Sequence, residues 1–405
     1  MFKNAMRVTS VLTPLLFVLF AGGLLAQGTA ENIEGIACEI TAGQASYKAA
    51  QPMTIVFKLK NETADTMYVL KWKTPLEGFN SDMFVVMRGE DKLTYIGRVV
   101  KRGAPKPGDY VKISPHGMVE TSVDLSEAYA VFEKGDYSVT YSSYIYDMGK
   151  AKPVELAAKE QFAPKVIQSA AATFNVAEAR PYKAIPTPSA TAEGGTSFQG
   201  CSQTQQAVID SALLEARNLV TGAMITLAIV PEASRDTCHR YTTWFGTYAE
   251  ARWEKVKSNY DVIYDALTNK NMAFCCTCQS DYYAYVYPTQ PYKIYLCNAF
   301  WNAPLTGTDS KAGTIIHETS HFNVVAGTGD YAYGHANCKN LANTNPANAI
   351  RNADSHEYFA ENTPNINCYQ IKTGPERIML WILIALAILG FEILRRHYRR
   401  RRLQS

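Results

Sequence analysis

The chain has 405 residues, which is room for two or three domains, and its 47% apolar content is ample for more than one hydrophobic core. The net charge of +3 is uneven: residues 1–26 carry +2 and residues 376–405 carry +5, which leaves −4 for the body between them. A mildly acidic body gives no electrostatic basis for binding nucleic acid, so we exclude that class of partner.

Residues 1–26 have the pattern of a secretory signal peptide. Lys3 and Arg7 precede the apolar run 11–25, and the small residue Ala26 stands before Gln27. This order predicts cleavage after Ala26 and export of the chain. Export places the chain in a compartment where disulfides form and persist.

The chain contains nine cysteines, so at least one is unpaired or pairs with another chain. Cys275, Cys276 and Cys278 are close enough in sequence to suggest a metal cluster. In an exported chain whose other cysteines are dispersed, however, disulfides are the better interpretation. We therefore predict a disulfide framework.

The segment 27–178 reads as β-structure. Ile55, Phe57 and Leu59 alternate with other residues in the run 54–60, which is typical of a half-buried strand. Clusters of Gly, Pro, Asn and Asp separate this run from six further short runs at 67–72, 83–87, 94–99, 119–123, 137–144 and 172–176. Short strands at this spacing predict an all-β immunoglobulin-like sandwich.

Residues 179–198 are rich in Pro, Ala, Thr and Gly and predict a linker. From 199 to 372 the pattern becomes mainly helical. Ser202 and Gln205 form a capping box at the start of an amphipathic helix, and residues 282–297 predict a short hairpin. Further helices are expected at 244–268, 311–325, 336–343 and 346–359. We therefore expect a mainly α (α+β) domain with a small sheet beside its central helix.

The predicted helix at 311–325 carries an H-E-x-x-H element. His317 and His321 lie four residues apart, so both imidazoles project from one face and can bind a single metal ion. Glu318 follows one residue round the helix, where a carboxylate can take a proton from metal-bound water. The glycine-rich turn that follows ends the helix and brings Asp330 within reach as a third ligand.

This element resembles the motif of the Asp-zincin metallopeptidases, the deuterolysin-like family, when it is taken together with Gly327-Thr-Gly-Asp-Tyr-Ala-Tyr-Gly334. The chain looks most like the peptidyl-Lys metalloendopeptidases, over roughly residues 197–363. The resemblance implies a zincin-type metallopeptidase domain that binds one Zn²⁺ per chain and acts on proteins or peptides. Four further segments also resemble this family: Arg240-Tyr-Thr-Thr-Trp-Phe-Gly246, Tyr285-Val-Tyr-Pro288, Leu296-Cys-Asn-Ala-Phe-Trp301 and Asn352-Ala-Asp-Ser-His-Glu-Tyr-Phe359.

The resemblance also implies roles for residues outside the metal set. Tyr333 would be the phenol that stabilises the oxyanion of the reaction. Asp354 and Glu357 stand three apart in a helical stretch, so their carboxylates can share one face, and a solvated acidic face is the ordinary interpretation of such a pair. The family likeness implies instead that this pair selects lysine on the carboxyl side of the scissile bond.

Two disulfides are implied by the same resemblance, Cys201–Cys276 and Cys278–Cys297. The five remaining cysteines depart from the family pattern, and their pairing is a hypothesis. It joins Cys238 to Cys275 and Cys338 to Cys368, and leaves Cys38 free.

Two questions of organisation stay open at this stage. In the resembled enzymes the mature protease begins just before its first disulfide cysteine, here near Thr196. The predicted sandwich is therefore either the pro-region of a zymogen or a permanent accessory domain. The chain is either an active endopeptidase or a zinc-binding surface protein whose sandwich mediates adhesion, and the presence of both Glu318 and Tyr333 favours the enzyme.

Residues 376–394 predict a transmembrane helix. The run from 378 is apolar except for Glu392, and arginines follow at 395, 396 and 399–402. The run is at the short end for a bilayer, but the arginine cluster favours a membrane boundary with a basic cytoplasmic tail at 395–405. The catalytic domain would then face outward from the cell envelope. This sequence of an apolar helix followed by an arginine cluster is also similar to bacterial sorting tails, which are cleaved off the protein. The membrane anchor is therefore either permanent or transient, and in the transient case the protein is released outside the cell.

Overall fold

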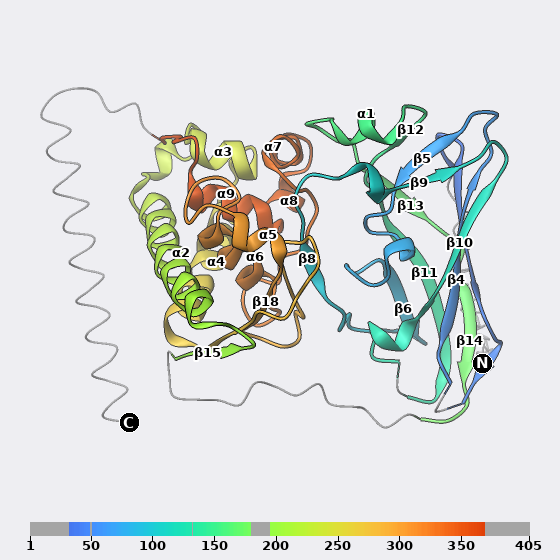
Figure 1. Cartoon of the computed structure of the whole chain (residues 1–405). Coiled ribbons are helices and arrows are strands. Elements are labelled where there is room, and N and C mark those ends of the chain that lie inside the picture. The colour runs from blue at the N-terminus through green and yellow to red at the C-terminus, as the bar shows by residue number, and fades with distance from the viewer. Residues whose placement is uncertain (1–31, 49–50, 132, 180–194, 369–405) are drawn as a thin grey trace, which may run out of the picture.

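The computed structural model describes residues 32–48, 51–131, 133–179 and 195–368. The chain forms two parts with separate apolar cores, drawn side by side in Figure 1. We call residues 32–179 the β-rich part and residues 195–368 the helical part. The predicted signal peptide and the predicted transmembrane helix lie outside the described residues, as does most of the predicted linker.

The β-rich part is built from three sheets. The first has the order β1-β2-β4-β10, with bounds Asn32–Ile33, Ile36–Ala42, Thr54–Asn61 and Met118–Asp124. The second has the order β3-β14-β11-β6-β7, with β13 also on β11, and bounds Ser46–Tyr47, Ala172–Val176, Gly135–Ile145, Phe84–Arg88, Asp91–Lys92 and Lys165–Gln168. The third has the order β12-β5-β9, with bounds Met148–Gly149, Met67–Leu70 and Tyr110–Ile113. Short helical segments connect them: α1 (Pro153–Ala157), η1 (Pro75–Glu77), η2 (Pro107–Asp109) and η3 (Leu125–Glu127).

Alternation along β4 explains how the two larger sheets pack. Ile55, Phe57 and Leu59 are buried as predicted, and they share one core with Val139 and Tyr141 of β11. Two sheets over a common core agree with the prediction of an all-β part, while its immunoglobulin-like identity stays a prediction. The run 94–99 is an exception, because the strand found there is displaced to β8 (Val99–Lys101) and pairs with the helical part.

The helical part surrounds one core, and α6 lies at its centre. From Ala312 to His321 every residue of α6 is buried, against α2, α4 and α9. The predicted capping box is confirmed. The side chain of Ser202 accepts a hydrogen bond from the backbone N–H of Gln205, and the side chain of Gln205 accepts one from the backbone N–H of Ser202. The helices are α2 (Gln203–Ile229), η4 (Glu232–Ser234), α3 (His239–Phe245), α4 (Glu250–Asn269), α5 (Asn298–Asn302), α6 (Lys311–His321), α7 (His335–Thr344), α8 (Pro346–Ala349) and α9 (Ala353–Glu361).

Two helices that the sequence predicted as continuous are broken. The helix expected at 244–268 is divided into α3 and α4, because Gly246 has a φ of 80° and ends α3. The helix expected at 346–359 is divided into α8 and α9 around Asn352, which has extended backbone angles. The helix expected at 311–325 is shorter than predicted, because Phe322 leaves the helical conformation.

The sheet beside α6 contains strands from both parts of the chain. Its order is β15-β16-β18-β17-β8, with bounds Thr196–Gln199, Met272–Cys275, Lys293–Leu296, Ala284–Val286 and Val99–Lys101. The predicted hairpin is confirmed as the antiparallel pair β17 and β18. Because β15 pairs with β16, the linker prediction was wrong from Thr196 onward. In Figure 1, β8 lies between the two parts, and it pairs antiparallel with β17 at the edge of the sheet.

The cysteine predictions are partly confirmed. The two disulfides implied by family likeness are present: Cys201–Cys276 and Cys278–Cys297. The two hypothetical pairs are wrong, because Cys238 bonds to Cys368 and leaves Cys38, Cys275 and Cys338 as buried free thiols. Cys275 and Cys276 are neighbours in extended chain, so their side chains point in opposite directions and only Cys276 faces Cys201.

Helix α2 is long and apolar enough to cross a membrane by length and composition alone. Its apolar residues, including Ile209, Leu213 and Val220, are instead buried in the core of the helical part. We therefore interpret α2 as a core helix of that part.

The break at Gly246 generates a stability prediction. A Cβ at this position would lie 2.1 Å from the carbonyl oxygen of Ala342, and the backbone is left-handed. We expect Gly246→Ala to lower the free energy of unfolding by at least about 2 kcal/mol, since strain and overpacking add. The matched control is Gly222→Ala, where a Cβ meets nothing within 4 Å in the interior of α2. It should stabilise by about 0.5–1 kcal/mol. Calorimetric melting temperatures that move in the same direction for both variants would contradict this account.

Candidate metal centre

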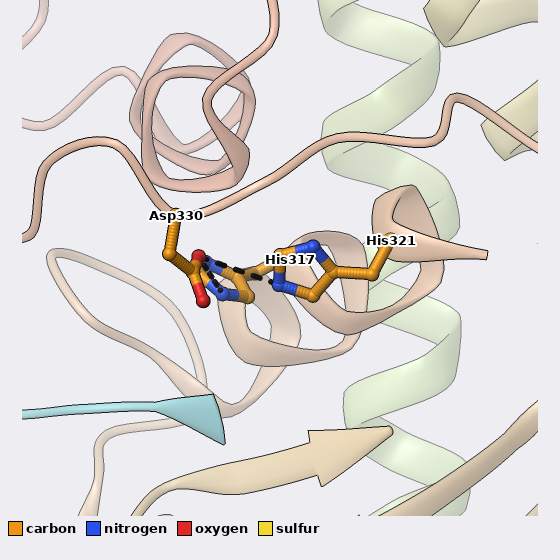
Figure 2. A group of neighbouring side chains, drawn as sticks. All are labelled: His317, His321 and Asp330. Atoms are coloured by element: carbon orange, nitrogen blue, oxygen red, sulfur yellow. Dashed lines mark ion pairs between the residues drawn. The ribbon is translucent and has the colours of Figure 1, made fainter. Parts of the chain in front are cut away.

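Helix α6 carries both predicted histidine ligands on one face. The Nε2 atoms of His317 and His321 lie 3.2 Å and 3.4 Å from Oδ1 of Asp330, and Figure 2 shows the three side chains directed at a common point. The helix begins at Ser310, whose side chain accepts a hydrogen bond from the backbone of Gly313. The structure therefore brings together the three residues that sequence reasoning grouped as ligands.

Asp330 is positioned by the break between α8 and α9. The side-chain oxygen of Asn352 accepts hydrogen bonds from the backbone N–H groups of Tyr331 and Ala332, at 2.8 and 3.0 Å. Gly329 forms a single parallel β-bridge with Asn352. The chain that follows α6 is thereby fixed against the start of α9, and the carboxylate of Asp330 is directed back at the helix.

The two histidines present the same ring nitrogen to this point because their other nitrogens are engaged. Nδ1 of His321 lies 2.9 Å from the carbonyl oxygen of Thr328, so it carries the proton and donates. Nδ1 of His317 lies 2.7 Å from Oδ1 of Asp354. A carboxylate or carbonyl behind each imidazole leaves the Nε2 lone pair free and makes it a stronger metal ligand.

The residues present fit a metal ion. His317 Nε2, His321 Nε2 and Asp330 Oδ1 are buried, make no hydrogen bond within the described part of the chain, and lie within 4.8 Å of one another. A buried polar atom without a hydrogen-bond partner is energetically unfavourable. Three such atoms directed at one point indicate a binding site for a cation. Two imidazole nitrogens and one carboxylate oxygen are a donor set of catalytic zinc, which leaves a fourth position for water or substrate.

Glu318 occupies the next position of α6 and interacts electrostatically with His317, His321 and Asp330. Both of its carboxylate oxygens are buried and lack hydrogen-bond partners among the described residues. Burial raises the pKa of Glu318 to about 7, partly offset by the neighbouring His317. A carboxylate that is free of partners and holds a proton weakly at neutral pH can exchange protons with a molecule bound beside it.

Tyr333 contacts the second carboxylate oxygen of Asp330. Its hydroxyl is 3.1 Å from Oδ2 of Asp330 and donates to the carbonyl oxygen of Val100, 3.2 Å away. Its ring packs against Trp72 and Tyr146 of the β-rich part, and burial raises the pKa of the phenol. The phenol is therefore protonated and able to donate a hydrogen bond at the metal centre.

Asp354 and Glu357 lie on α9, and they are buried rather than solvated. The ammonium of Lys101 is buried with them, with Nζ 2.6 Å from Glu357 and 3.3 Å from Asp354. Asp309 is the third carboxylate of this group, 3.2 Å from the same nitrogen. Although burial opposes ionisation, Lys101 holds the pKa of Asp354 down, at about 2. We call Asp309, Asp354 and Glu357 the lysine pocket.

Two members of this arrangement were missed by sequence reasoning. Lys101 lies two residues beyond the strand predicted at 94–99, and no local pattern links it to α9. Asp309 precedes the N-cap Ser310 and reads as an ordinary turn residue. His317, Asp354 and Glu357 could themselves bind a cation, but the ammonium of Lys101 already lies between the two carboxylates.

The close approach of α9 to α6 depends on Gly313. A Cβ there would lie 2.0 Å from a carboxylate oxygen of Glu361 and 2.7 Å from one of Glu357. Glu361 accepts hydrogen bonds from the backbone N–H and hydroxyl of Ser310, which ties α9 to the start of α6. His356 lies in the core beside Phe245 and Asn259.

Comparison with known proteins identifies relatives of both parts. Residues 231–361 match the sequence profile of the family described as lysine-specific metallo-endopeptidase. The chain is 40% identical over 312 residues to an extracellular protease of Aeromonas hydrophila, which covers 76% of this chain and 88% of that protein. This alignment is longer than the whole chain from residue 195 onward, so it extends into the β-rich part.

Two further proteins match a smaller share of the chain. A peptidyl-Lys metalloendopeptidase of Pleurotus ostreatus is 46% identical over 168 residues, which is 41% of this chain and 97% of the relative. The solved structure of a zinc peptidase from Grifola frondosa is 43% identical and is covered completely, against 41% of this chain, with a TM-score of 0.39.

The contact between His317 and Asp354 generates a metal-binding prediction. Asp354→Asn removes the charge behind the imidazole, and we expect it to weaken zinc binding by about 10- to 100-fold. Competition with a chromophoric chelator measures the affinity directly, independent of any activity. Asp281→Asn is the control, because this exposed carboxylate pairs with Lys106 and does not touch a ligand. Equal zinc affinity for Asp354→Asn and the unmodified chain would refute the role given to this carboxylate.

Proposed function

The chain belongs to the lysine-specific metallo-endopeptidase family, and on that premise we propose that it is a zinc endopeptidase that cuts peptide bonds on the amino side of lysine. The observation that carries the proposal is the convergence of three unpartnered ligand atoms beside the carboxylate of Glu318. The relatives named peptidyl-Lys metalloendopeptidases support the lysine preference.

In this proposal His317, His321 and Asp330 hold one zinc ion. When bound, zinc acts as a Lewis acid and lowers the pKa of a coordinated water to about 7. Glu318 accepts the proton of the attacking water at its carboxylate and passes it to the amine that leaves. The buried position of Glu318 favours this exchange, since neither oxygen is held by another group of the described chain.

Tyr333 supplies the hydrogen bond to the substrate carbonyl. Its hydroxyl already donates to a backbone carbonyl oxygen, that of Val100, at 3.2 Å. A preorganised donor at this place stabilises the negative charge that develops on the oxygen in the transition state. The ring is held by Trp72 and Tyr146, which supports a fixed rather than a mobile donor.

The lysine pocket selects the residue that follows the cut bond. Three carboxylates around one site match a compact ammonium, and an apolar side chain there would leave buried charges unpaired. Lys101 supports this assignment, because its ammonium is bound in the pocket by Asp309, Asp354 and Glu357. We propose Asp309 as a third carboxylate of this pocket, beside Asp354 and Glu357, which the sequence already suggested.

We further propose that the protein is exported and that the β-rich part is a pro-region, with maturation near Thr196. The extracellular relative from Aeromonas hydrophila supports export. Attachment to the cell envelope by residues 376–394, with 395–405 on the cytoplasmic side, remains a proposal from the sequence, because both segments lie outside the described residues.

Glu318→Gln tests the assignment of the base. The amide keeps the size of the side chain but cannot accept a proton, so hydrolysis should fall at least about 100-fold. Zinc content, measured by atomic absorption, should stay at one ion per chain. Hydrolysis at the normal rate in the zinc-loaded variant would refute the assignment of Glu318.

Asp309→Asn and Glu357→Gln test the specificity pocket. Each change removes one charged hydrogen bond to the lysine ammonium, so kcat/KM for a lysine peptide should fall about 10- to 100-fold. The same peptide with norleucine in place of lysine should lose much less. In a digest of a denatured protein, the unmodified enzyme should produce new N-termini that are mainly lysine. An even spread of residues at that position would exclude the pocket while leaving the zinc chemistry intact.

A further inference from the structure

Asp309 differs from the other two carboxylates of the lysine pocket because it lies on a loop. Asp354 and Glu357 belong to α9, and their side chains are 1% and 0% exposed, whereas the side chain of Asp309 is 35% exposed. Asp309 directly precedes Ser310, the N-cap of α6. A side chain on a loop is held accurately in a binding pocket only when other groups fix the loop.

The backbone of this loop needs such support. Asp309 has a φ of 52°, in the left-handed region, and a residue with a side chain keeps this conformation where the contacts around it hold it there. On one side the loop borders a cavity of about 480 Å³, which Thr308 and Asp309 help to line. The position of Asp309 therefore depends on the contacts that the loop makes with α9.

The carboxyl group of Glu361, near the end of α9, accepts three hydrogen bonds from the loop. Its Oε2 accepts from the backbone N–H of Asp309 at 3.2 Å. Its Oε1 accepts from the backbone N–H and the hydroxyl of Ser310, at 2.9 and 2.7 Å. One side chain thus fixes two consecutive backbone N–H groups. Without it, these groups would lose their acceptor, and the loop would have to move to find another.

Tyr358 fixes the side chain of Asp309 as Glu361 fixes its backbone. The Tyr358 hydroxyl lies 2.8 Å from Oδ1 of Asp309 and 3.1 Å from Oδ2 of Asp354. Asp354, Glu357, Tyr358 and Glu361 follow one another at helical spacing, so they share one face of α9. This face supplies two carboxylates of the pocket and also fixes the third.

Glu361 acts through hydrogen bonds rather than through charge. Burial and the neighbouring Glu357 raise the pKa of Glu361 to about 9, although the bonds from Ser310 oppose this shift. The group is therefore protonated at neutral pH, and it adds no fourth negative charge beside the pocket. Its contribution lies in the place that it gives to the loop.

We propose that Glu361 is a positioning residue for lysine selection, which holds the loop so that the Asp309 carboxylate meets the ammonium of the substrate lysine. The inference rests on the proposed function, and it adds a residue that acts through Asp309 without contacting the substrate. Since Glu318 and the proposed metal ligands lie on other segments, Glu361 affects how tightly lysine is bound more than how fast the bond is cut.

Glu361→Ala tests the inference in the zinc-loaded full chain. We expect kcat/KM for a lysine peptide to fall about tenfold, mainly through KM, because one charged contact to the ammonium is misplaced. The values for the norleucine peptide should stay nearly unchanged. Glu361→Gln keeps an oxygen for Ser310 but loses the acceptor of the Asp309 N–H, so its loss should be smaller. The control is Glu250→Ala, which removes an exposed carboxylate paired with Arg235 and should change neither peptide.

A double variant separates an effect through Asp309 from a general structural effect. In a chain that already carries Asp309→Asn, Glu361→Ala should lower the ratio of lysine to norleucine hydrolysis no further. A full additional loss in that background would overturn the inference, as would an unchanged ratio for Glu361→Ala alone. An unchanged ratio for Asp309→Asn alone would overturn the place of Asp309 in the proposed function, and this inference with it.

Hydrogen exchange follows the loop without any substrate. In Glu361→Ala, the backbone amides of Asp309 and Ser310 should exchange about tenfold faster or more, while Glu250→Ala leaves them unchanged. Unchanged exchange in Glu361→Ala would overturn the inference. Failure of every chain, the unmodified one included, to cut either peptide while exchange changes as expected would instead overturn the proposed catalytic function. If Glu361→Ala does not fold, Glu361→Gln takes its place, with the same directions expected and the same results against them.

Discussion

The carboxylate of Asp354 is the interaction on which the rest of the site depends. One oxygen lies 2.7 Å from His317 and 3.3 Å from the Lys101 ammonium, and the other accepts from the Gly334 N–H at 2.8 Å and the Tyr358 hydroxyl at 3.1 Å. A buried charge is tolerated only when it is paired and hydrogen-bonded. Helix α6, the loop of Tyr333 and the lysine pocket are thereby joined at one side chain, so the proposed metal site and the proposed lysine selection depend on the same carboxylate.

The same constraint explains why the two parts of the chain are joined so closely. Removing one partner from a buried ion pair costs about 3–5 kcal/mol, because the remaining charge stays desolvated. The buried carboxylates of Asp354 and Glu357 need a cation beside them, and Lys101 provides one. The β-rich part therefore stabilises this site, and Lys101 occupies the pocket that we propose for a substrate lysine.

Breaks in regular structure determine how the segments of the helical part meet at the candidate site. Gly246 separates α3 from α4, Asn352 separates α8 from α9, and the bend after His321 directs the chain back to Asp330. Each break replaces intrahelical hydrogen bonds with contacts to another segment, as when Asn352 accepts from Tyr331 and Ala332. Helical periodicity does not contain this information, which is why the sequence predicted longer, continuous helices there.

The sequence by itself grouped the three proposed metal ligands, because His317 and His321 are related by the helical repeat and Asp330 follows after a short glycine turn. It also determined the strands with clear alternation, such as β4, and the capping box at Ser202. Only the tertiary structure decided that Cys238 meets Cys368, that Asp309 joins Asp354 and Glu357, and that Lys101 enters their pocket. These partners are far apart in sequence, and their meeting depends on how two independently patterned parts pack, which no local spacing encodes.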